Sequence, residues 1–364
     1  MAPNSKVNAR RKAKREPAKA KPSKRDVESV VSSSIPIELQ QLLLDIFRNS
    51  FAARFETDIN PLLQEVKGHL YNRDFAAAFG KTEYLEAYAA RWSPSRALGY
   101  LDVFWDLREH LWSAKDIEEE SNDVNISSKR SHKIVCLGGG AGAEIVALAG
   151  LQALLSNPDE NNDEQHAIKV ETLAVDIADW TTVVENLAKH ITTTPPLSKY
   201  ASAAAQAANH QLVNPEDIDI SFHHQDVFTA YTNEISSHLK DANLVTLLFT
   251  LNELYSTSIS LTQKFLLSMT EAMKPGSLLL VIDSPGSYSS ITLNGAEKKY
   301  PMQWLLDHTL LKQAGGKQER GKQEIVLWEK VEEDESRWFR LDPELTYPIE
   351  LENMRMQLHL YRRL

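Results

Sequence analysis

The stretch Lys133-Ile134-Val135-Cys136-Leu137-Gly138-Gly139-Gly140-Ala141-Gly142-Ala143-Glu144 combines a short apolar run, a glycine-rich segment and the start of an apolar helical pattern. This order predicts a strand, a tight turn and a helix that opens near Ala143. Glycine suits the turn because the backbone needs positive φ and close approach to a ligand that a Cβ would block. The free N–H groups of the helix start would point at that ligand. The motif predicts a nucleotide-like cofactor, and it also fits the dinucleotide pattern G-x-G-x-x-G/A.

The amino-terminal segment differs in composition from the rest of the chain. Residues 1–25 carry ten Lys or Arg and one acidic residue, Glu16, for a net charge of about +9. Because the formal net charge of the chain is −10, the remaining residues carry about −19. The segment has no aromatic residues or β-branched runs with which to form a core, so we expect a disordered basic tail over residues 1–34. Such basic clusters serve as nuclear or nucleolar addresses, as phosphate-binding arms, or only as solubilising tails.

Several classes of protein do not fit this composition. The single cysteine, Cys136, falls within the first predicted strand, which leaves no disulfide framework or zinc knuckle within one chain. No apolar run approaches the ~20 residues of a membrane span, and the tail lacks the apolar stretch of a secretion signal. The histidines, including His223 and His224, lack metal-ligand spacing. We therefore expect a soluble protein with no membrane partner and no structural metal.

The chain divides into four predicted segments. Apolar residues at helical spacing after the tail predict a helical N-terminal subdomain over residues 35–115. Within it, Ser93 is predicted to cap a helix whose first residue is Pro94. A polar segment, residues 116–132, is predicted to be a linker. Over residues 133–364 strands and helices alternate, which predicts an α/β domain with a mostly parallel sheet and right-handed crossovers.

Two aspartates follow predicted strands of this sheet. After the first strand we expect others at Lys169–Val175, Ile218–His223, Leu244–Phe249 and Leu278–Ile282, with a final pair at Glu324–Lys330 and Met354–Tyr361. Ligands bind beyond the carboxyl ends of parallel strands. Asp176, after the second strand, could accept hydrogen bonds from a ribose diol, and Asp226, after the third, from an adenine amine. Each could instead cap a helix.

Residues 133–364 resemble the class I S-adenosylmethionine (SAM)-dependent methyltransferases, which have a Rossmann-like fold. The resemblance rests on the glycine loop, Asp176, the pair Asp226-Val227, the turn Lys274-Pro275-Gly276 and the terminal strand pair. It implies SAM as the cofactor, bound in part by Asp226 and Val227, with the methionine moiety lined by Gly138, Gly140 and Gly142.

The chain departs from the class I pattern at Cys136, where the family often has an acidic residue that contacts the amino group of the cofactor. Glu144 is a candidate substitute for that contact. It could equally stabilise the start of its helix by a favourable charge–dipole interaction.

Three segments, Tyr88–Leu98, Leu137–Glu144 and Thr250–Ser256, are similar to the fungal 25S ribosomal RNA uracil-N3 methyltransferases. This resemblance covers nearly the whole chain after the tail. It implies methylation of a uridine imide nitrogen in large-subunit rRNA, with rRNA or a pre-ribosomal particle as the partner. The implied location is the nucleus, and within it the nucleolus, which agrees with the basic tail.

The residues themselves limit which atoms could accept the methyl group. Methylation at pyrimidine C5 generally requires a cysteine nucleophile in a partly exposed site, and a buried Cys136 cannot serve, so nitrogen or oxygen acceptors remain. After the fourth strand, Asn252 could hydrogen-bond a uracil carbonyl or imide and Glu253 could be the base. Tyr255 could stack on the base. The alternative is a strand end followed by a capped helix.

Two arginines near Pro94, Arg91 and Arg96, could close over the cofactor, hold phosphates or form intrahelical salt bridges. RNA binding by an acidic body would depend on the tail, on a partner or on local basic patches such as residues 337–340 and 355–363. Two other functions remain open. An NAD(P)-dependent oxidoreductase is one, although Asp176 stands farther along than the ~20 residues typical of that motif. A catalytically silent SAM-binding ribosome-assembly protein is the other.

Overall fold

The computed structural model describes residues 33–112, 131–156, 168–197, 199–203, 206, 209–229, 233–286, 288–293, 296–315 and 325–364. The predicted basic tail, apart from its last two residues, lies outside the described residues, as does most of the predicted linker. Residues Ile35–Leu364 form one compact unit. None of the helices in the described part of the chain has the length and hydropathy that a membrane crossing requires.

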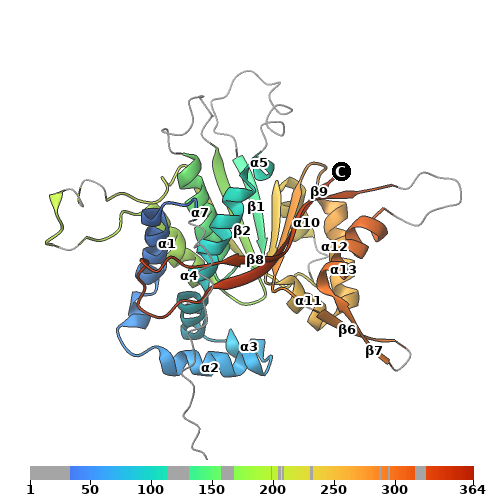
Figure 1. Ribbon diagram of the computed structural model, residues 1–364, viewed down its shortest axis with the longest axis horizontal. Coiled ribbons are helices and arrows are strands. Elements are labelled where there is room, and N and C mark those ends of the chain that lie inside the picture. Colours follow the sequence, from blue (N-terminus) through green and yellow to red (C-terminus); the bar gives the residue numbers. More distant parts are fainter. Residues whose placement is uncertain are drawn as a thin grey trace, which may run out of the picture. The chain divides into compact units, whose positions relative to one another are not determined.

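The centre of this unit is a seven-stranded sheet with the order β3-β2-β1-β4-β5-β9-β8 (Figure 1). Strands β1 to β5 pair in parallel, β9 runs antiparallel to β5, and β8 runs antiparallel to β9. The strands are β1 (Ser131–Leu137), β2 (Lys169–Asp176), β3 (Ile218–His224), β4 (Leu244–Leu248), β5 (Leu278–Asp283), β8 (Trp328–Phe339) and β9 (Met354–Arg363). The prediction of a mostly parallel α/β sheet is confirmed.

Helices cover both faces of the sheet (Figure 1). In the described residues, the helices that precede β1 are α1 (Ile37–Ser50), η1 (Ala52–Phe55), α2 (Asn60–Tyr71), α3 (Phe75–Ala78), α4 (Thr82–Asp106) and α5 (Arg108–Leu111). Those after β1 are α7 (Ala143–Leu155), α8 (Thr181–Thr192), α10 (Asn233–Asp241), α11 (Leu251–Thr257), α12 (Ile259–Ala272), α13 (Met302–Asp307) and η2 (His308–Gln313).

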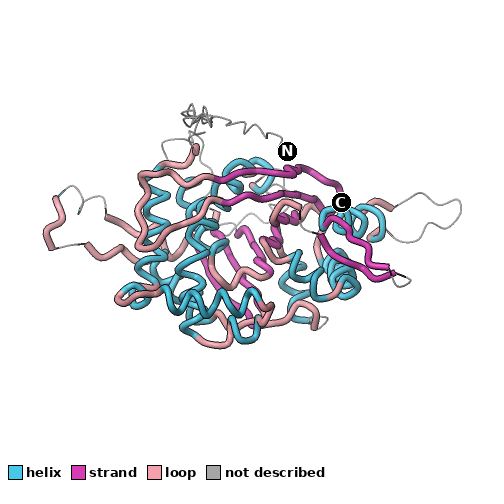
Figure 2. The backbone as a smooth tube through the Cα atoms, turned by 60° about the horizontal axis from the view of Figure 1, so that its bottom comes forward, coloured by secondary structure: helices cyan, strands magenta, loops and turns pink. Residues whose placement is uncertain are grey.

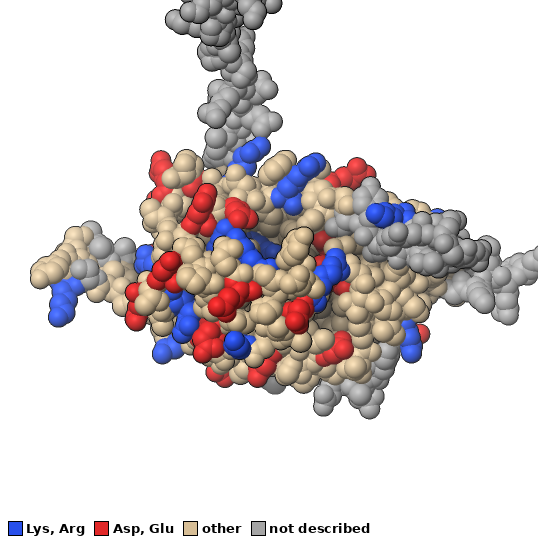
Figure 3. Space-filling view, turned by 90° about the horizontal axis from the view of Figure 1, so that it is seen from below, with Lys and Arg blue, Asp and Glu red and all other residues tan. Residues whose placement is uncertain are grey.

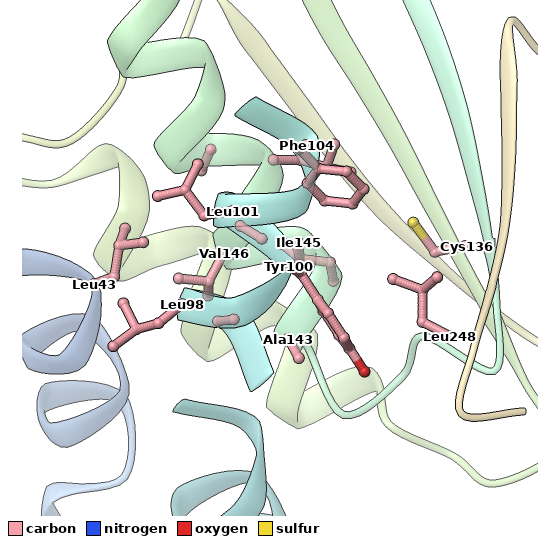
Figure 4. Close-up of a cluster of buried hydrophobic side chains, with 14 of the residues drawn as sticks. Leu43, Leu98, Tyr100, Leu101, Phe104, Cys136, Ala143, Ile145, Val146 and Leu248 are labelled. Atoms are coloured by element: carbon pink, nitrogen blue, oxygen red, sulfur yellow. The ribbon is translucent and has the colours of Figure 1, made fainter. Parts of the chain in front are cut away.

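The central strands, such as β4 and β5, are apolar on both sides because each face of the sheet has its own core. Ile134 and Cys136 of β1 point into a core built with α1, α4, α7 and α8, whereas Val135 and Leu137 point into a core built with α10 to α13. Figure 4 shows the first core, in which side chains of α4 such as Phe104 lie between α1 and the strands. The helices predicted between residues 35 and 112 thus share a core with the sheet.

Helix α4 continues through Pro94, so the predicted helix start at this residue is wrong. A proline inside a helix leaves the carbonyl four residues earlier without its usual donor, which costs about 3 kcal/mol. Here the hydroxyl of Tyr347 donates to the Ala90 carbonyl at 2.8 Å. The Ser93 hydroxyl, predicted to cap a helix, instead donates to the Ala141 carbonyl at 2.7 Å. A tyrosine distant in sequence therefore replaces the missing donor.

The carboxyl-terminal third differs from the prediction in two places. The penultimate strand was expected at 324–330, but β8 begins at Trp328 and continues to Phe339 through an acidic stretch with two register shifts. Charges and irregularities of this kind are typical of an edge strand, which β8 is. A second, two-stranded sheet of β6 (Tyr288–Leu293) and β7 (Ala296–Pro301) was not predicted, and it stands away from the main sheet (Figure 2).

Candidate active site

The glycine-rich segment forms a tight loop between β1 and α7, as predicted. Gly138 and Gly142 have φ values of 80° and 83°, which glycine adopts without strain. The N–H of Gly138 donates to the Val175 carbonyl at 2.7 Å, which fixes the loop to β2. A Cβ at Gly138 would overlap the Thr250 side chain, and one at Gly140 would overlap the indole of Trp180. The loop therefore admits no side chain at either position.

Asp176, at the end of β2, is joined to this loop. Its Oδ2 accepts the N–H of Gly140 at 3.2 Å, and its Oδ1 accepts the N–H of Ala178 at 3.2 Å. Burial raises the pKa of the Asp176 carboxyl group, and these two hydrogen bonds partly offset the rise. The structure thus brings Asp176 and the glycine loop together, and the carboxylate holds the loop and its own turn in place.

Glu144 is buried beneath the loop with only 3% of its surface exposed. The hydroxyl of Thr246, in β4, donates to its Oε1 at 2.7 Å, and its Oε2 lies 2.7 Å from where a Cβ of Gly139 would stand. Burial raises the pKa of Glu144 to about 8, although the hydrogen bond from Thr246 opposes this shift. The same Cβ of Gly139 would also lie 2.7 Å from the Cβ of Cys136. The carboxyl group of Glu144 therefore lies close to Cys136, the position at which class I methyltransferases often have an acidic residue.

Arg96 of α4 brings a positive charge to the same place. Its Nη1 donates to the hydroxyl of Tyr88 at 2.9 Å, and its guanidinium lies 5.1 Å from the centre of the Phe249 ring. Burial opposes the charge, but Tyr88, Tyr100 and Glu144 outweigh it, so the pKa of Arg96 lies above its ordinary value. The alternative of an intrahelical salt bridge is not found for Arg96 among the described residues, where its contacts are with Tyr88 and Phe249.

Aromatic side chains from segments far apart in sequence form a cluster over the glycine loop. The Phe79 ring lies 5.3 Å from Tyr88 and 5.4 Å from Trp180, and Tyr88 lies 4.9 Å from Trp92. Sequence reasoning did not include these residues in the site, except for the segment containing Tyr88 and Trp92. Their separation along the chain explains the omission, because no local pattern links α3 and α4 to the turn after β2.

The segment after β4 carries the residues predicted to face the acceptor. The backbone N–H of Asn252 donates to Oδ2 of Asp283 at 3.0 Å, which fixes the start of α11. The Oδ1 atom of Asn252 is buried, and none of the described residues gives it a hydrogen bond. Glu253 is 43% exposed, and its Oε2 lies 3.8 Å from Nη1 of Arg73. A buried unpaired acceptor is costly, so the amide of Asn252 is suited to a ligand that donates a hydrogen bond.

The predicted stacking role of Tyr255 is wrong. Tyr255 is only 2% exposed and packs into the core beneath α11, one helical turn from Leu251 on the same face. Phe249 is better placed for that role, because it is partly buried at the carboxyl end of β4 and contacts Arg96. Its φ of 59° is unusual for a bulky residue, and such strain is concentrated at functional sites.

Three other predicted residues have local roles in the structure. Asp226 accepts the N–H of Phe228 at 2.9 Å within its own turn, and the helix α10 begins only at Asn233, so this contact is not the predicted alternative of a helix cap. Val227 lines a groove of about 390 Å³ between α10 and α12. Arg91, only 8% exposed, donates to Glu352 at 2.5 Å, a partner far along the chain instead of one in its own helix. None of these contacts reaches the glycine loop.

Seen from the side of α3 and α11, the surface is hollowed, and Lys and Arg side chains lie within the hollow with Asp and Glu around it (Figure 3). The carboxyl ends of the parallel strands lie on this side (Figure 1). Among the described residues, no group of His, Cys, Asp or Glu could hold a metal ion. Cys136 is fully buried, as predicted, and burial raises the pKa of its thiol. The arrangement offers a glycine loop open to a cofactor, a buried carboxyl group close to a partly buried guanidinium, and a polar edge after β4.

Comparison with known proteins agrees with this geometry. A family model of SAM-dependent methyltransferases matches residues 47–362. The 25S rRNA (uridine(2843)-N(3))-methyltransferase of Saccharomyces cerevisiae is 36% identical over 340 residues, which cover 88% of this chain and 85% of the yeast protein.

Solved structures of SAM-dependent methyltransferases are also similar. One from Methanosarcina mazei is 9% identical with a TM-score of 0.34, and the match covers 65% of this chain and 95% of that one. One from Leishmania major is 11% identical with a TM-score of 0.35, covering 76% and 81%. At these values the structural likeness adds nothing to the assignment. The family match over most of the chain, together with the sheet order and the glycine loop, sets aside the oxidoreductase alternative, and the chain belongs to the SAM-dependent methyltransferases.

Proposed function

We propose that this protein transfers the methyl group of SAM to N3 of a uridine in large-subunit rRNA. The yeast relative supports the substrate class, since it is similar over most of both chains. The observation that carries the chemistry is the buried, unpaired Oδ1 of Asn252 beside the carboxyl edge of the sheet. The imide N3–H of uracil is a hydrogen-bond donor that would pair with this acceptor as the uridine binds, before the base removes the proton and frees the N3 lone pair for the methyl group.

The residues of the loop region fit SAM. Its methionine end carries an ammonium and a carboxylate, and the site offers the carboxylate of Glu144 and the guanidinium of Arg96, which are close enough for each to shift the pKa of the other. We assign Glu144 to the ammonium and Arg96 to the carboxylate. Gly138, Gly140 and Gly142 keep the loop free of side chains so that its backbone can approach the cofactor, and Asp176 accepts hydrogen bonds from the ribose.

Asp226 and Val227 remain candidates for the adenine end of the cofactor, together with Ile177. This isoleucine follows Asp176 and is 63% exposed, so its apolar surface is available to a flat ring. Arg91 is less well placed than Arg96 because Glu352 already neutralises it. When bound, SAM would supply an electrophilic methyl group on a sulfonium.

On the acceptor side, the chain has to orient the uracil and accept one proton. Asn252 would hold the imide edge, and Phe249 would stack against the ring in place of the buried Tyr255. Glu253, exposed and paired only loosely with Arg73, is the candidate base for the imide proton, either directly or through a water molecule. Orientation of N3 in line with the methyl–sulfur bond would supply much of the rate.

Single-turnover methyl transfer to rRNA, with identification of the product nucleoside, tests this function. We expect N3-methyluridine, and we expect Asn252→Ala and Glu253→Gln to slow transfer at least tenfold while SAM affinity is unchanged, because both residues act on the acceptor. The control is Cys136→Ala, which should lose stability through the cavity left in the core and yet remain active. A C5-methylated product, or an RNA adduct through Cys136 that survives denaturation, would refute the nitrogen acceptor.

We also propose that the protein acts in the nucleolus, within the nucleus, and that the basic tail directs it there. The support is the concentration of about nine net positive charges in residues 1–25, next to an acidic body. Deletion of residues 1–25 should leave SAM binding intact and reduce nucleolar accumulation of a fluorescent fusion. If the tail also contacts rRNA, the dependence of RNA affinity on salt should become shallower. A truncated protein that localises and methylates normally would leave the tail only a solubilising role.

A further inference from the structure

The arginines near the carboxyl terminus differ in how their charges are used. Arg337 pairs with two carboxylates of α4, those of Asp102 and Asp106. Arg362 pairs with Glu329 at 2.9 Å. These two charges are therefore balanced by neighbouring carboxylates.

Arg363 donates to the backbone carbonyls of Thr270 and Leu327, each at 3.1 Å. It thus fastens the end of β9 to its surroundings. Neither this arginine nor the two paired ones is placed to attract an external anion.

Two other arginines lie around an exposed indole. The guanidinium groups of Arg340 and Arg355 lie 5.1 and 5.7 Å from the ring centre of Trp338, which is 52% exposed. Arg355 also donates to the hydroxyl of Ser336 at 2.9 and 2.7 Å, a partner without charge. An exposed aromatic face with guanidinium groups beside it is the combination that binds stacked bases and their phosphates.

The register of the sheet places this indole near the candidate active site. Gln357 of β9 pairs with Asp283, the last residue of β5, so Arg355 lies two residues beyond the carboxyl end of β5. Trp338 of the edge strand β8 pairs with Arg355. Asp283 in turn binds the backbone of Asn252. The indole and its two arginines therefore lie beyond the same edge of the sheet that carries the acceptor residues.

We propose that Trp338, Arg340 and Arg355 form a platform for an unpaired stretch of the RNA substrate next to the target uridine. A base would stack on the indole, and the guanidinium groups would contact neighbouring phosphates, as single-stranded RNA is commonly bound. Local contacts of this kind are needed because the body of the protein is acidic. The inference rests on the proposed function, since it takes RNA as the substrate.

A second exposed tryptophan offers a matched control. Trp304 is 47% exposed, but its ring is stacked with Tyr300 at 5.1 Å and with His308 at 5.2 Å, at interplanar angles of 24° and 19°. Its partners are aromatic rings of this chain, with no arginine beside it in the contacts of the described residues. Loss of Trp304 should therefore have little effect on RNA binding.

The test uses the full-length protein and a labelled single-stranded oligouridine, together with a fragment of large-subunit rRNA. Trp338→Ala should raise the Kd for both RNAs about 5- to 100-fold. Arg355→Gln should reduce the slope of log affinity against log salt by about 1. Trp304→Ala and Arg362→Gln should leave the affinity and the slope unchanged. In methyl transfer, Trp338→Ala should raise KM for RNA with kcat and SAM affinity unchanged.

The outcomes separate the platform from the proposed function. Equal RNA affinities for Trp338→Ala and Trp304→Ala would overturn the platform, even if the wild-type protein methylates rRNA. The platform would also be overturned if Trp338→Ala bound RNA as tightly as wild type but lost binding to a protein in ribonuclease-treated extract. If wild-type protein fails to methylate any rRNA but Trp338→Ala still weakens RNA binding, the platform holds and the proposed activity fails.

Discussion

Replacement of Gly140 by arginine should abolish SAM binding in a protein that still folds. Even a Cβ at this position would overlap the buried indole of Trp180, and the remaining side chain would extend into the space that the loop keeps for the cofactor. Isothermal titration should detect no heat of binding with SAM or with its demethylated product. The wild-type protein should bind both.

The matched control for this substitution is Gly68→Arg in α2. Nothing lies within 4 Å of a Cβ at Gly68, so the same side chain is added on an open surface. It should leave SAM binding intact and stabilise the helix slightly, by about 0.5–1 kcal/mol. Circular dichroism and thermal unfolding report whether each variant folds, and Gly140→Ala provides a smaller change if the arginine variant does not. Normal SAM affinity in a folded Gly140→Arg protein would place the cofactor elsewhere.

The central strands of the sheet, such as β4 and β5, could be predicted from sequence because they are buried on both faces. Such strands are continuous apolar runs, and β4, with all five residues buried, is an example. The glycine loop was also predictable, since its backbone conformation restricts which residues can occupy it. Each of these features depends on neighbours within a few residues, which is the range over which a sequence pattern is informative.

Features that depend on distant contacts could not be predicted in this way. Pro94 indicates a helix start unless Tyr347, 253 residues later, supplies the missing hydrogen bond. From sequence, Tyr255 is a candidate to stack on the acceptor base, and only the orientation of α11 shows that its side chain lies in the core. Trp180 and Phe79 meet over the glycine loop only after the chain has folded. The acceptor side of the site is therefore less accessible to sequence reasoning than the cofactor loop.

The second large effect should come from Glu144→Gln, which is expected to stabilise the protein and weaken SAM binding. Burial raises the pKa of this carboxyl group from its ordinary value of 4.5 to about 8. The folded protein therefore favours the protonated form more than the unfolded chain does. The cost of burying the charge is absent below about pH 4.5, grows as the pH rises towards 8, and then stays constant.

Glutamine removes that cost and can still accept the hydrogen bond from Thr246 through its amide oxygen. At pH 7 the free energy of unfolding should rise by on the order of 2–4 kcal/mol. The gain over wild type should disappear towards pH 4, as denaturant unfolding at several pH values would show. Glu185→Gln, an exposed glutamate of α8, should show no such pH-dependent gain.

The same substitution should weaken SAM binding about 10- to 100-fold, because a charged hydrogen bond to the ammonium of the cofactor is lost. In the wild-type protein, SAM affinity should rise between pH 6 and 8 as Glu144 ionises on binding, and this rise should be absent in Glu144→Gln. Isothermal titration across this pH range, in buffers of different ionisation enthalpy, measures the affinity and the protons released together. A variant that is more stable but binds SAM as tightly as wild type, with an unchanged pH profile, would leave Glu144 as a helix-start residue and move the ammonium site away from it.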